Sequence, residues 1–558
     1  MPVWIWFLGA HGLSQTWPKL LRRLLYLLLI APAAYPQAMP QFEPGGVVNA
    51  ASYAQPISPG AIVSIFGTSL ASTTATAQGA PLPNELAGTS VTINDTKATL
   101  FYVSPTQINL QVPWSTQWAY FDYSQASIVV KTAAGSSSSV QVPIFQSGPS
   151  LFSKDGSGCG QAAALNINSD GSISVNSPSN SAAPGDFVSL YGTGVGAPYY
   201  PPADGDYVTG LTPFESSPGV VLAGSTLQAV QYGGLAPFLV GVDQINFQIP
   251  QGTAEGCAVP VSVISGQFGI LSPTVSVGIH SEHGQCVDPP TQSYGSVTFT
   301  QTVTSSTSSV TSADTLTASF PSGPGTTVPQ PPAPSPPDSW TNSITPITMS
   351  RSCSVNGQSQ LSAGTLTVQA NGTGQTGMAQ PIPVTGGVEY HQSLPNGFIS
   401  PGQYTVSASG GPAAFQGTLT MPQPIQITTP LTPGTQISVS RNFVINWTGG
   451  APGELVKLSL VANEGLFSSV DTAYVDASAG SFTFSPICMG HSVITGGNGV
   501  YCAFGVLMTP GPTGNVSVEV DLLPSSGYAS VVNAKGITQG VQLSWMYRYV
   551  FNGLSLSQ

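Results

Sequence analysis

Two stretches of the chain alternate polar and apolar residues in the same way. Residues 107–113 read Gln-Ile-Asn-Leu-Gln-Val-Pro, and residues 244–250 read Gln-Ile-Asn-Phe-Gln-Ile-Pro. A period of two is typical of a β-strand with one buried face and one face in water. A second shared phrase, Pro-Gly followed by an apolar run, precedes each stretch at residues 59–68 and 184–193. We therefore predict a duplicated module in which both phrases form equivalent strands.

The spacing of strand-like runs predicts an all-β chain of tandem immunoglobulin-like β-sandwich modules, because short alternating runs are separated by turn residues and no helical period is present. The predicted parts are a first module at 40–148, a second at 149–288 that repeats it, a Ser/Thr/Pro-rich tether at 289–345, a third module at 346–422 and a fourth at 424–558. Two alternating runs in the tether, 296–303 and 315–320, could be strands of the next module.

The first 38 residues predict a secretory signal peptide. Lys19, Arg22 and Arg23 precede an apolar run at 24–30, and an Ala-Pro-Ala sequence that fits a cleavage site follows. The run is too short to cross a membrane. The alternative is an uncleaved anchor that also recruits residues 4–8. No later stretch is apolar enough for a span, so we expect a secreted or cell-surface protein.

The low content of charged residues and the net negative charge are the compositional features that exclude a class of partner. Only 6% of the 558 residues are charged, far below the roughly 25% of an ordinary soluble domain. The formal net charge is −12, and it becomes −15 without the three cations of the leader. A nucleic-acid partner is not expected, because binding a polyanion needs a basic patch.

The chain has six cysteines, which suits an oxidising compartment. They are Cys159, Cys257, Cys286, Cys353, Cys488 and Cys502. Cys257 and Cys286 bracket the last strands of the second module, and Cys488 and Cys502 bracket one loop, so we predict these two disulfides. The pairing of the other two cysteines stays open.

Several phrases of the first two modules resemble a known family. They are residues 47–53 (Val-Val-Asn-Ala-Ala-Ser-Tyr), 58–60 (Ser-Pro-Gly), 101–105 (Phe-Tyr-Val-Ser-Pro), 107–109 (Gln-Ile-Asn) and 191–194 (Tyr-Gly-Thr-Gly). From about residue 46 to residue 288 the chain resembles the Solibacter-type C-terminal domain family of secreted acidobacterial proteins. Residues 400–450 resemble the tail common in these proteins, although the cysteine that often precedes an Ala-Gly-Ser-Phe-Thr phrase follows it here. The resemblance implies immunoglobulin-like sandwiches and carries no known active site.

Two motif matches are better explained as turns. Residues 192–197 match a dinucleotide-binding Gly-x-Gly-x-x-Gly/Ala pattern, but Pro198 and further prolines exclude the helix that this motif requires. Residues 166–173 resemble the first half of a calcium loop, but its twelfth position is Ser177 instead of a bidentate Glu. An Asx-rich hairpin turn is the favoured interpretation.

Candidate catalytic and metal-binding residues are few. Residues 280–286 hold two His, one Glu and Cys286, but their spacing matches no zinc site, and an oxidised cysteine cannot bind a metal. No Gly-x-Ser-x-Gly motif is present. A triad around His391 or His491 stays open, because triads are assembled in space. We predict no catalytic residues, no metal and no cofactor.

The candidate ligand-binding residues are aromatic and lie in two predicted loops. They are Trp114, Trp118, Tyr120, Phe121 and Tyr123 after the first Gln-Ile-Asn strand, and Tyr199, Tyr200 and Tyr207 in the second module. Flat rings on loops can stack on sugar or peptide faces. The alternative is that they seal the sandwich ends or the joint between modules.

We therefore predict a non-catalytic extracellular protein that functions in binding, adhesion or scaffolding. Its candidate partners are an extracellular polysaccharide or a surface protein. The alternatives are a carbohydrate-binding module array and a carbohydrate-active or other hydrolytic enzyme.

Overall fold

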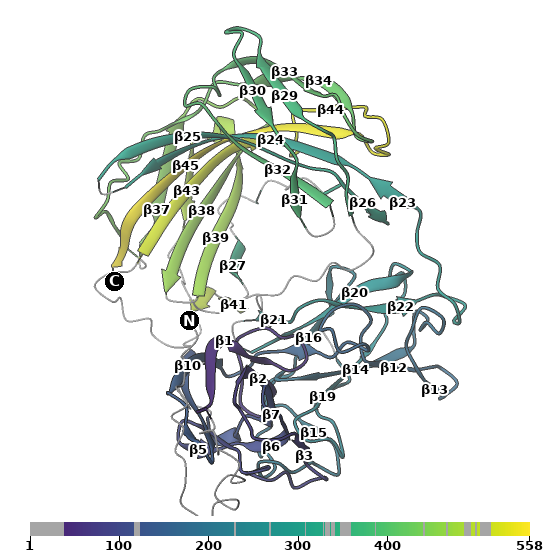
Figure 1. The fold of residues 1–558 in the computed structure, drawn as a ribbon. Helices are drawn as coiled ribbons and strands as arrows, with labels where there is room; N and C mark the ends of the chain where they lie inside the picture. The colour runs from purple at the N-terminus through teal and green to yellow at the C-terminus, as the bar shows by residue number, and fades with distance from the viewer. Residues whose placement is uncertain are drawn as a thin grey trace, which may run out of the picture.

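The computed structural model is built almost entirely of β-strands (Figure 1). It describes residues 38–116, 123–227, 230–266, 269–306, 308–326, 328–329, 335, 341–345, 359–384, 387–438, 441–464, 467–484, 493–496, 499–502 and 515–557. Within these ranges the only helical segments are two short 3-10 helices, η1 (Trp114–Thr116) and η2 (Ala477–Ala479). No helix in this part of the chain is long and apolar enough to cross a membrane. The predicted signal peptide lies outside the described residues, apart from residue 38.

The first module is a sandwich of two antiparallel sheets. One sheet has the order β1 (Gln41–Asn49), β2 (Ile62–Thr68), β7 (Gln107–Gln111), β6 (Thr99–Val103) and β3 (Ala75–Thr76). The other has the order β10 (Val140–Phe145), β8 (Tyr123–Thr132), β4 (Ser90–Ile93) and β5 (Thr96–Lys97), with β9 (Gly135–Ser136) paired to β8. Apolar residues such as Val63, Ile65 and Ile108 fill the core between the sheets.

The second module repeats this arrangement. Its first sheet has the order β13 (Ile173–Val175), β12 (Ala164–Ile167), β14 (Phe187–Thr193), β19 (Asp243–Gln248), β18 (Tyr232–Leu235) and β15 (Thr212–Pro213), with β11 (Ser150–Leu151) paired to β14. Its second sheet has the order β17 (Ser225–Leu227), β16 (Gly219–Leu222), β20 (Gly256–Ser265) and β21 (Ile270–Leu271), with β22 (Val275–Ile279) paired to β20. The core includes Val188, Leu190 and Ile245.

The strand register confirms the predicted duplication. In the first module Ser64 of β2 lies opposite Asn109 of β7. In the second module Ser189 of β14 lies opposite Asn246 of β19. The two shared phrases therefore form the same pair of neighbouring central strands, in the same register, in both modules.

The Pro-Gly phrase supplies the turn that begins each of these strands. Gly60 and Gly185 have φ angles of +75° and +99°, a region that favours glycine. Their carbonyl groups accept hydrogen bonds from the Nε2 of Gln111 (3.4 Å) and of Gln248 (2.8 Å), respectively. The last glutamine of each Gln-Ile-Asn phrase thus fixes the turn that precedes its partner strand.

The C-terminal half is organised around one large sheet, seen at the top of Figure 1. Its order is β27 (Thr341–Thr345), β39 (Phe467–Asp476), β38 (Glu454–Glu464), β43 (Asn515–Pro524), β45 (Val541–Ser557), β24 (Gly295–Ser305), β25 (Val310–Ser319), β32 (Gly387–Leu394) and β31 (Ile382–Val384), with β36 (Gln436–Ser438) and β44 (Ser530–Val532) paired to β45. The two alternating runs of the predicted tether are strands β24 and β25, and β24 pairs in parallel with β45 near the C-terminus.

Within the described residues, four smaller sheets accompany this large sheet. They are β30 (Thr376–Ala379), β29 (Leu366–Ala370), β33 (Gly402–Ala408) and β34 (Phe415–Met421); β35 (Gln426–Ile427), β37 (Phe443–Thr448) and β40 (Ser481–Phe484); β23 (Thr291–Ser293), β26 (Pro321–Pro324) and β28 (Ser359–Gln360); and the hairpin β41 (Val493–Gly496) with β42 (Gly499–Cys502). A single hydrophobic core extends from Val297 to Leu554. The strands of the predicted tether, third module and fourth module therefore share one sheet and one core.

Tyr404 at the start of β33 carries a feature typical of immunoglobulin-like sandwiches. Its hydroxyl donates to the backbone carbonyls of Phe398 or Ser400, each 2.8 Å away, and accepts from the Ser400 amide at 2.8 Å. A buried tyrosine that bonds back to the preceding loop in this way is a tyrosine corner. It fixes the loop before β33 against the core.

The disulfide predicted between Cys257 and Cys286 is present, with Cα atoms 5.2 Å apart. Cys159 is also disulfide-bonded. Cys353 and Cys488 lie outside the described residues, so the predicted bond between Cys488 and Cys502 stays a prediction.

Candidate functional site

Trp114 lies in the joint between the first two modules. Its side chain is 8% exposed and packs with the core of the second module. A Cβ atom at Gly60 would overlap the ring, so glycine at this position gives the indole its space. The ring therefore offers no exposed face for stacking on a ligand. Its backbone N–H donates to Asp204 Oδ1 of the second module at 2.9 Å.

The loop that carries the predicted tyrosines of the second module folds back onto the first module. The Gly205 N–H donates to Gln111 Oε1 at 2.7 Å, and the Leu82 N–H donates to the Gly205 carbonyl at 2.8 Å. Gly205 has a φ of +81° and is buried, and a Cβ atom at this position would lie too close to Thr99 and Leu82 of the first module. This loop is held at its middle by the neighbouring module.

Buried polar groups complete the joint. Asn49, which is fully buried, donates from Nδ2 to the carbonyls of Gly148 and Thr193, both at 3.2 Å. The Ile62 N–H donates to Thr193 Oγ1 at 2.8 Å, and this hydroxyl donates to the Gly241 carbonyl at 2.6 Å. Breaking the joint would leave these groups buried without partners or require water to reach them, so the two modules form one rigid pair.

The other predicted aromatic residues fall into two groups. Tyr199 and Tyr200 are 70% and 90% exposed, and Tyr207 is 38% exposed. Trp118 and Tyr120, with Phe121, lie outside the described residues. Tyr123 begins strand β8, and the structure does not describe its side chain. Exposed aromatic rings are therefore described in the second module but not in the connection that follows the first Gln-Ile-Asn strand.

Sequence reasoning missed Phe238 and Leu239, which are exposed on the connection between β18 and β19. Phe238 lies beside Tyr207, with ring centroids 5.9 Å apart and planes inclined by 53°. Its N–H donates to the Val208 carbonyl at 2.8 Å, which ties this connection to the tyrosine-bearing loop. Leu211, at the end of that loop, is also exposed.

The two copies differ at this site, and the difference can be measured once the strand register is known. Tyr102 pairs with Asn109, and Tyr232 pairs with Asn246. The partners are seven positions apart in the first module and fourteen apart in the second, so the hairpin is seven residues longer in the second copy. The additional residues lie in the segment 236–242, which includes Phe238 and Leu239.

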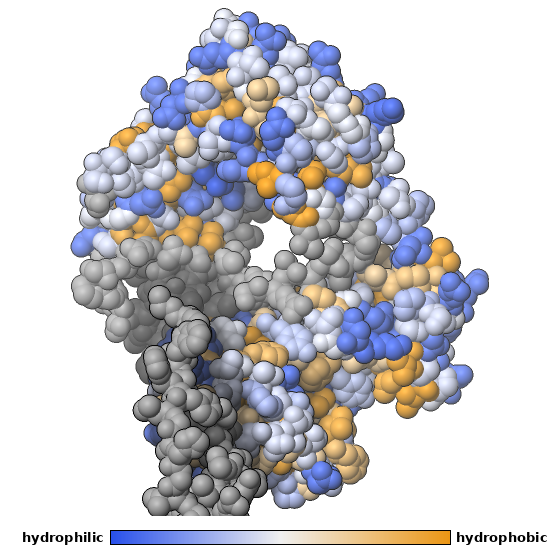
Figure 2. Space-filling model, in the orientation of Figure 1, coloured by the Kyte–Doolittle hydropathy of each residue, from blue (hydrophilic) through white to orange (hydrophobic). Residues whose placement is uncertain are grey.

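Hydrophobic residues gather on this part of the surface. Figure 2 shows them over β15 and β3, and a second group over β13. In Figure 1, β15 and β3 lie at the end of the module pair that points away from the C-terminal sheet.

We call residues 198–213 the tyrosine loop, and residues 236–242 the β18–β19 turn.

One buried carboxyl group supports the base of this region. Asp243, at the start of β19, accepts the Val195 N–H at 2.7 Å and is 3% exposed. Burial raises the pKa of this carboxyl well above its ordinary value, although the backbone N–H groups of Val195 and Gly194 act in the opposite direction. The bond connects the end of the β18–β19 turn to the beginning of the loop after β14.

The polar face of the Gln-Ile-Asn strands is occupied by hydrogen bonds within the modules. Asn109 Oδ1 accepts from Ser64 Oγ at 3.0 Å and from Gln107 Nε2 at 2.8 Å. The equivalent bond in the second module joins Gln244 Nε2 to Asn246 Oδ1 at 3.0 Å. These side chains mainly satisfy one another, which indicates a structural function.

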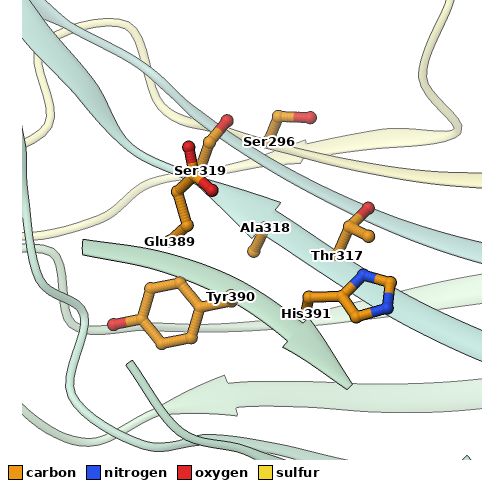
Figure 3. A pocket seen from close by; sticks show the side chains of 7 residues that line it. All are labelled: Ser296, Thr317, Ala318, Ser319, Glu389, Tyr390 and His391. Carbon is orange, nitrogen blue, oxygen red and sulfur yellow. The ribbon is translucent and has the colours of Figure 1, made fainter. Parts of the chain in front are cut away.

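A shallow hollow of about 260 Å³ lies on the large C-terminal sheet (Figure 3). Glu389 and His391 project from β32, and Thr317 of β25 lies opposite His391. Ser296 and Ser319 line the same hollow from β24 and β25. A catalytic triad needs a hydrogen bond between base and nucleophile. In the described part of the chain, no such bond joins the His391 ring to a hydroxyl, and His491 lies outside that part.

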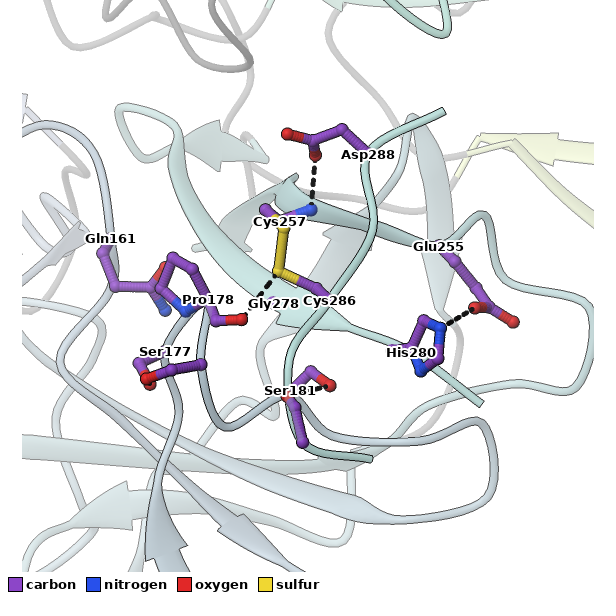
Figure 4. The surroundings of a disulfide bond; sticks show 12 residues. Gln161, Ser177, Pro178, Ser181, Glu255, Cys257, Gly278, His280, Cys286 and Asp288 are labelled. Carbon is purple, nitrogen blue, oxygen red and sulfur yellow. Dashed lines mark hydrogen bonds and ion pairs between the residues drawn. A yellow bond between two sulfur atoms is a disulfide. The ribbon is translucent and has the colours of Figure 1, made fainter. Parts of the chain in front are cut away.

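The two candidate metal-ligating histidines of residues 280–286 contact separate carboxylates, and Figure 4 shows the contact of His280 with Glu255. His280 Nε2 lies 3.8 Å from Glu255, and His283 Nε2 lies 2.7 Å from Asp186. Cys286 is in the disulfide and so is not a metal ligand. The described residues contain no group of three or more His, Cys, Asp or Glu side chains that could hold a metal ion.

Both motif matches are turns, as predicted. Residues 166–173 form the antiparallel hairpin of β12 and β13, in which Asp170 Oδ1 accepts from the N–H (2.8 Å) and hydroxyl (2.6 Å) of Ser172. These bonds hold the pKa of Asp170 below its ordinary value. Gly194, after β14, has a φ of +80°, and residues 195–211 contain no helix.

No protein-family model matches the chain, and no curated protein is similar to it. Solved structures give distant matches. A tetra-tandem repeat in the extending region of a large adhesion protein is 11% identical, covers 91% of this chain and 98% of its own length, and has a TM-score of 0.13. The FN1–FN3 domains of chicken CNTN1 are 8% identical over 62% of this chain and 94% of theirs, with a TM-score of 0.16. Sidekick-1 immunoglobulin domains 1–5 are 11% identical over 92% and 98%, with a TM-score of 0.11. The sheets themselves establish the fold class, tandem immunoglobulin-like β-sandwiches.

Proposed function

We propose that the chain is a secreted or cell-surface protein that acts in binding or adhesion and performs no catalysis. The observation that carries this proposal is the exposed aromatic surface of the second module, held by a rigid joint. Large exposed apolar patches on soluble proteins usually mark interaction sites. We further propose that the chain belongs to the Solibacter-type family that residues 46–288 resemble, whose members are secreted.

A binding assay on intact surfaces tests this function. The full-length protein, carrying an epitope tag, is incubated with washed bacterial and fungal cells, isolated cell walls and immobilised polysaccharides. We expect saturable retention on at least one of these surfaces. Absence of retention on all of them would contradict a binding or adhesive function.

The same samples test the hydrolytic alternative, which the hollow with Glu389 and His391 motivates. The supernatants are assayed for released reducing sugar and peptides over several hours. We expect no release above a heat-denatured control. Release that is lost in the His391→Ala variant would favour an enzyme over a binding protein.

A further inference from the structure

We propose that the tyrosine loop and the β18–β19 turn together form a binding site for a single, uncharged polysaccharide chain. This inference rests on the proposed binding function and assigns it a ligand class and a place. The side chains that would contact the ligand are Tyr199, Tyr200, Tyr207 and Phe238.

The rings are exposed but held by a rigid backbone. Tyr199 and Tyr200 lie between prolines in the sequence Pro-Tyr-Tyr-Pro-Pro at 198–202, and proline fixes φ. Gly205 ties the middle of the loop to the first module, and the Glu215 N–H closes its base by donating to the Ala197 carbonyl at 2.9 Å. Tyr232 Oη bonds to the backbone of Thr212. A preorganised aromatic surface loses little conformational entropy on binding.

The second copy differs from the first where these rings are found. The β18–β19 hairpin is seven residues longer than its counterpart. The connection from β14 to β15 covers residues 194–211, whereas the equivalent connection from β2 to β3 covers only residues 69–74. The joint needs only part of this added length, since Asp204, Gly205 and Gly241 lie against the first module. The remaining added residues expose aromatic rings to solvent.

The charge of the region argues against a polyanionic ligand, and its exposed rings suit a neutral sugar. The sequence contains no lysine or arginine from residue 155 to residue 350, and ten carboxylates lie between Asp155 and Asp288. Such a field repels polyanions such as nucleic acids and acidic polysaccharides. Two carboxylates of the tyrosine loop accept backbone N–H groups, Asp204 from Trp114 and Asp206 from Tyr207, so they also help to hold the loop in place. Stacking on rings and hydrogen bonding to phenol groups are the interactions that a neutral sugar needs.

The inclination of the rings favours an isolated chain over a crystalline surface. Tyr207 and Phe238 have planes inclined by 53°. A flat crystal face would contact only one of two inclined rings, whereas successive sugar units of a free chain can rotate to meet both. We therefore expect soluble or amorphous polysaccharide to bind better than the crystalline form of the same polymer.

The test compares defined probes on the full-length protein. Isothermal titration uses cellohexaose, laminarihexaose, xylohexaose and chitohexaose, with polygalacturonate and chitosan as the anionic and cationic polymers. Sedimentation assays compare amorphous with crystalline cellulose and chitin. We expect binding to at least one neutral probe, with an affinity that changes little between 20 mM and 500 mM salt. Binding of chitosan alone, abolished by salt, would overturn the neutral-ligand inference.

Matched variants locate the site. The Tyr199→Ala/Tyr200→Ala double variant and the Phe238→Ala variant should each weaken binding by about tenfold or more, since each loses stacked rings. Phe66→Ala is the control, because Phe66 also belongs to an exposed, tilted Tyr–Phe pair, with Tyr53 of the first module at 6.2 Å. It should leave the affinity unchanged. Thermal melting checks that every variant is folded.

The outcomes separate this inference from the proposed function. If the protein binds cells or polymers and all three variants bind equally well, the site assignment is wrong and the binding function stands. If no cell, wall or polymer retains the protein, both are wrong. Binding that is lost in the Phe66 variant instead would place the site on the first module.

Discussion

At the scale of single residues, Trp114 decides between two functions for the connection that follows β7. Its indole is buried at the joint, against Gly60 and the core of the second module. We expect Trp114→Ala to lower the free energy of unfolding of the module pair by about 3–5 kcal/mol, because a large buried ring leaves a cavity. Denaturant unfolding measures this, with Phe66→Ala as an exposed control. An unchanged midpoint would contradict the buried assignment.

Asp243 gives the module pair a dependence on pH. A raised pKa in the folded state means that the folded chain holds the proton more tightly than the unfolded chain does. The contribution of this group to stability is therefore fully present below the ordinary aspartate pKa of 3.8 and is lost as the pH rises through the raised pKa. As the pH rises from 3.8 through the raised pKa, we expect the Asp243→Asn variant to become more stable relative to the natural protein.

The control for this prediction is Asp155→Asn. Asp155 is exposed, and its hydrogen bonds with Ser157 and Ser153 lower its pKa to about 2. Its contribution to stability is therefore present above pH 3.8 and is lost only as the pH falls toward 2. Urea midpoints measured from pH 3 to pH 9 should show opposite slopes for the two variants. Parallel curves for the Asp243 variant and the natural protein would show that this carboxyl is not perturbed.

Tyr404 allows a stability prediction for the C-terminal half. Tyr404→Phe removes a hydroxyl that bonds to Phe398 and Ser400, but keeps the ring in the core. Buried carbonyls that lose a donor cost about 1–3 kcal/mol. We expect a lower melting temperature for the C-terminal half and no change in the module pair. Differential scanning calorimetry resolves the two, and a shift of the module pair instead would contradict the assignment.

At the scale of elements, the disulfide between Cys257 and Cys286 fastens the chain after β22 to the start of β20. It closes a loop with a sequence separation of 29 residues. Asp288 Oδ1 accepts the Cys257 N–H at 2.6 Å beside it. We expect the Cys257→Ala/Cys286→Ala variant to lose about 2–4 kcal/mol of stability in the second module. Chemical denaturation under non-reducing conditions measures the loss, and an unchanged midpoint would show that the hydrogen bonds alone suffice.

The elements that sequence could predict are those whose pattern is local. The Gln-Ile-Asn phrases alternate in hydrophobicity and follow Pro-Gly turns, so their strands and their equivalence follow from the residues alone. The sequence left two positions open for Trp114, a ligand-binding loop and the joint between modules, because an aromatic residue after a strand looks the same in both. The structure places it in the joint. Phe238 was missed because the lengths of the two hairpins can be compared only when the register is known.

Pairing across long separations also lies beyond local pattern. The alternating runs of β24 and β25 predict strands, but nothing in them specifies β45 as a parallel partner. Their Ser and Thr residues and the nearby Pro-rich stretch are typical of a tether. The sequence interpretation allowed both runs as strands of the next module, and the structure places them in the middle of the large sheet, between β45 and β32.

At the scale of the whole molecule, the chain contains two kinds of stable unit. The module pair has two cores, one for each sandwich, joined by buried hydrogen bonds. The C-terminal half has one core that runs from Val297 to Leu554. Strand β45 is central to it, because it pairs with β43, β24, β36 and β44.

The central position of β45 leads to a prediction about truncating the chain. A chain that ends at residue 540 loses β45, which separates β43 from β24 and exposes the apolar side of both, including Val297, Phe299 and Val520. Leu543 and Trp545 of β45 are themselves core residues. Because one core spans the C-terminal half, we expect this loss to unfold residues 295–540 together while the module pair stays folded.

Hydrogen–deuterium exchange with peptide resolution measures this unfolding. The peptides of β38 and β24 should lose protection along with those of β43, and the peptides of β2 and β14 should keep theirs. A control chain that ends at residue 555 removes only the end of the strand, where it pairs with β36, and should keep the protection of β38, β24 and β43. If β38 and β39 stayed protected in the shorter chain, the C-terminal half would contain separate folding units, and the single-core description would be wrong.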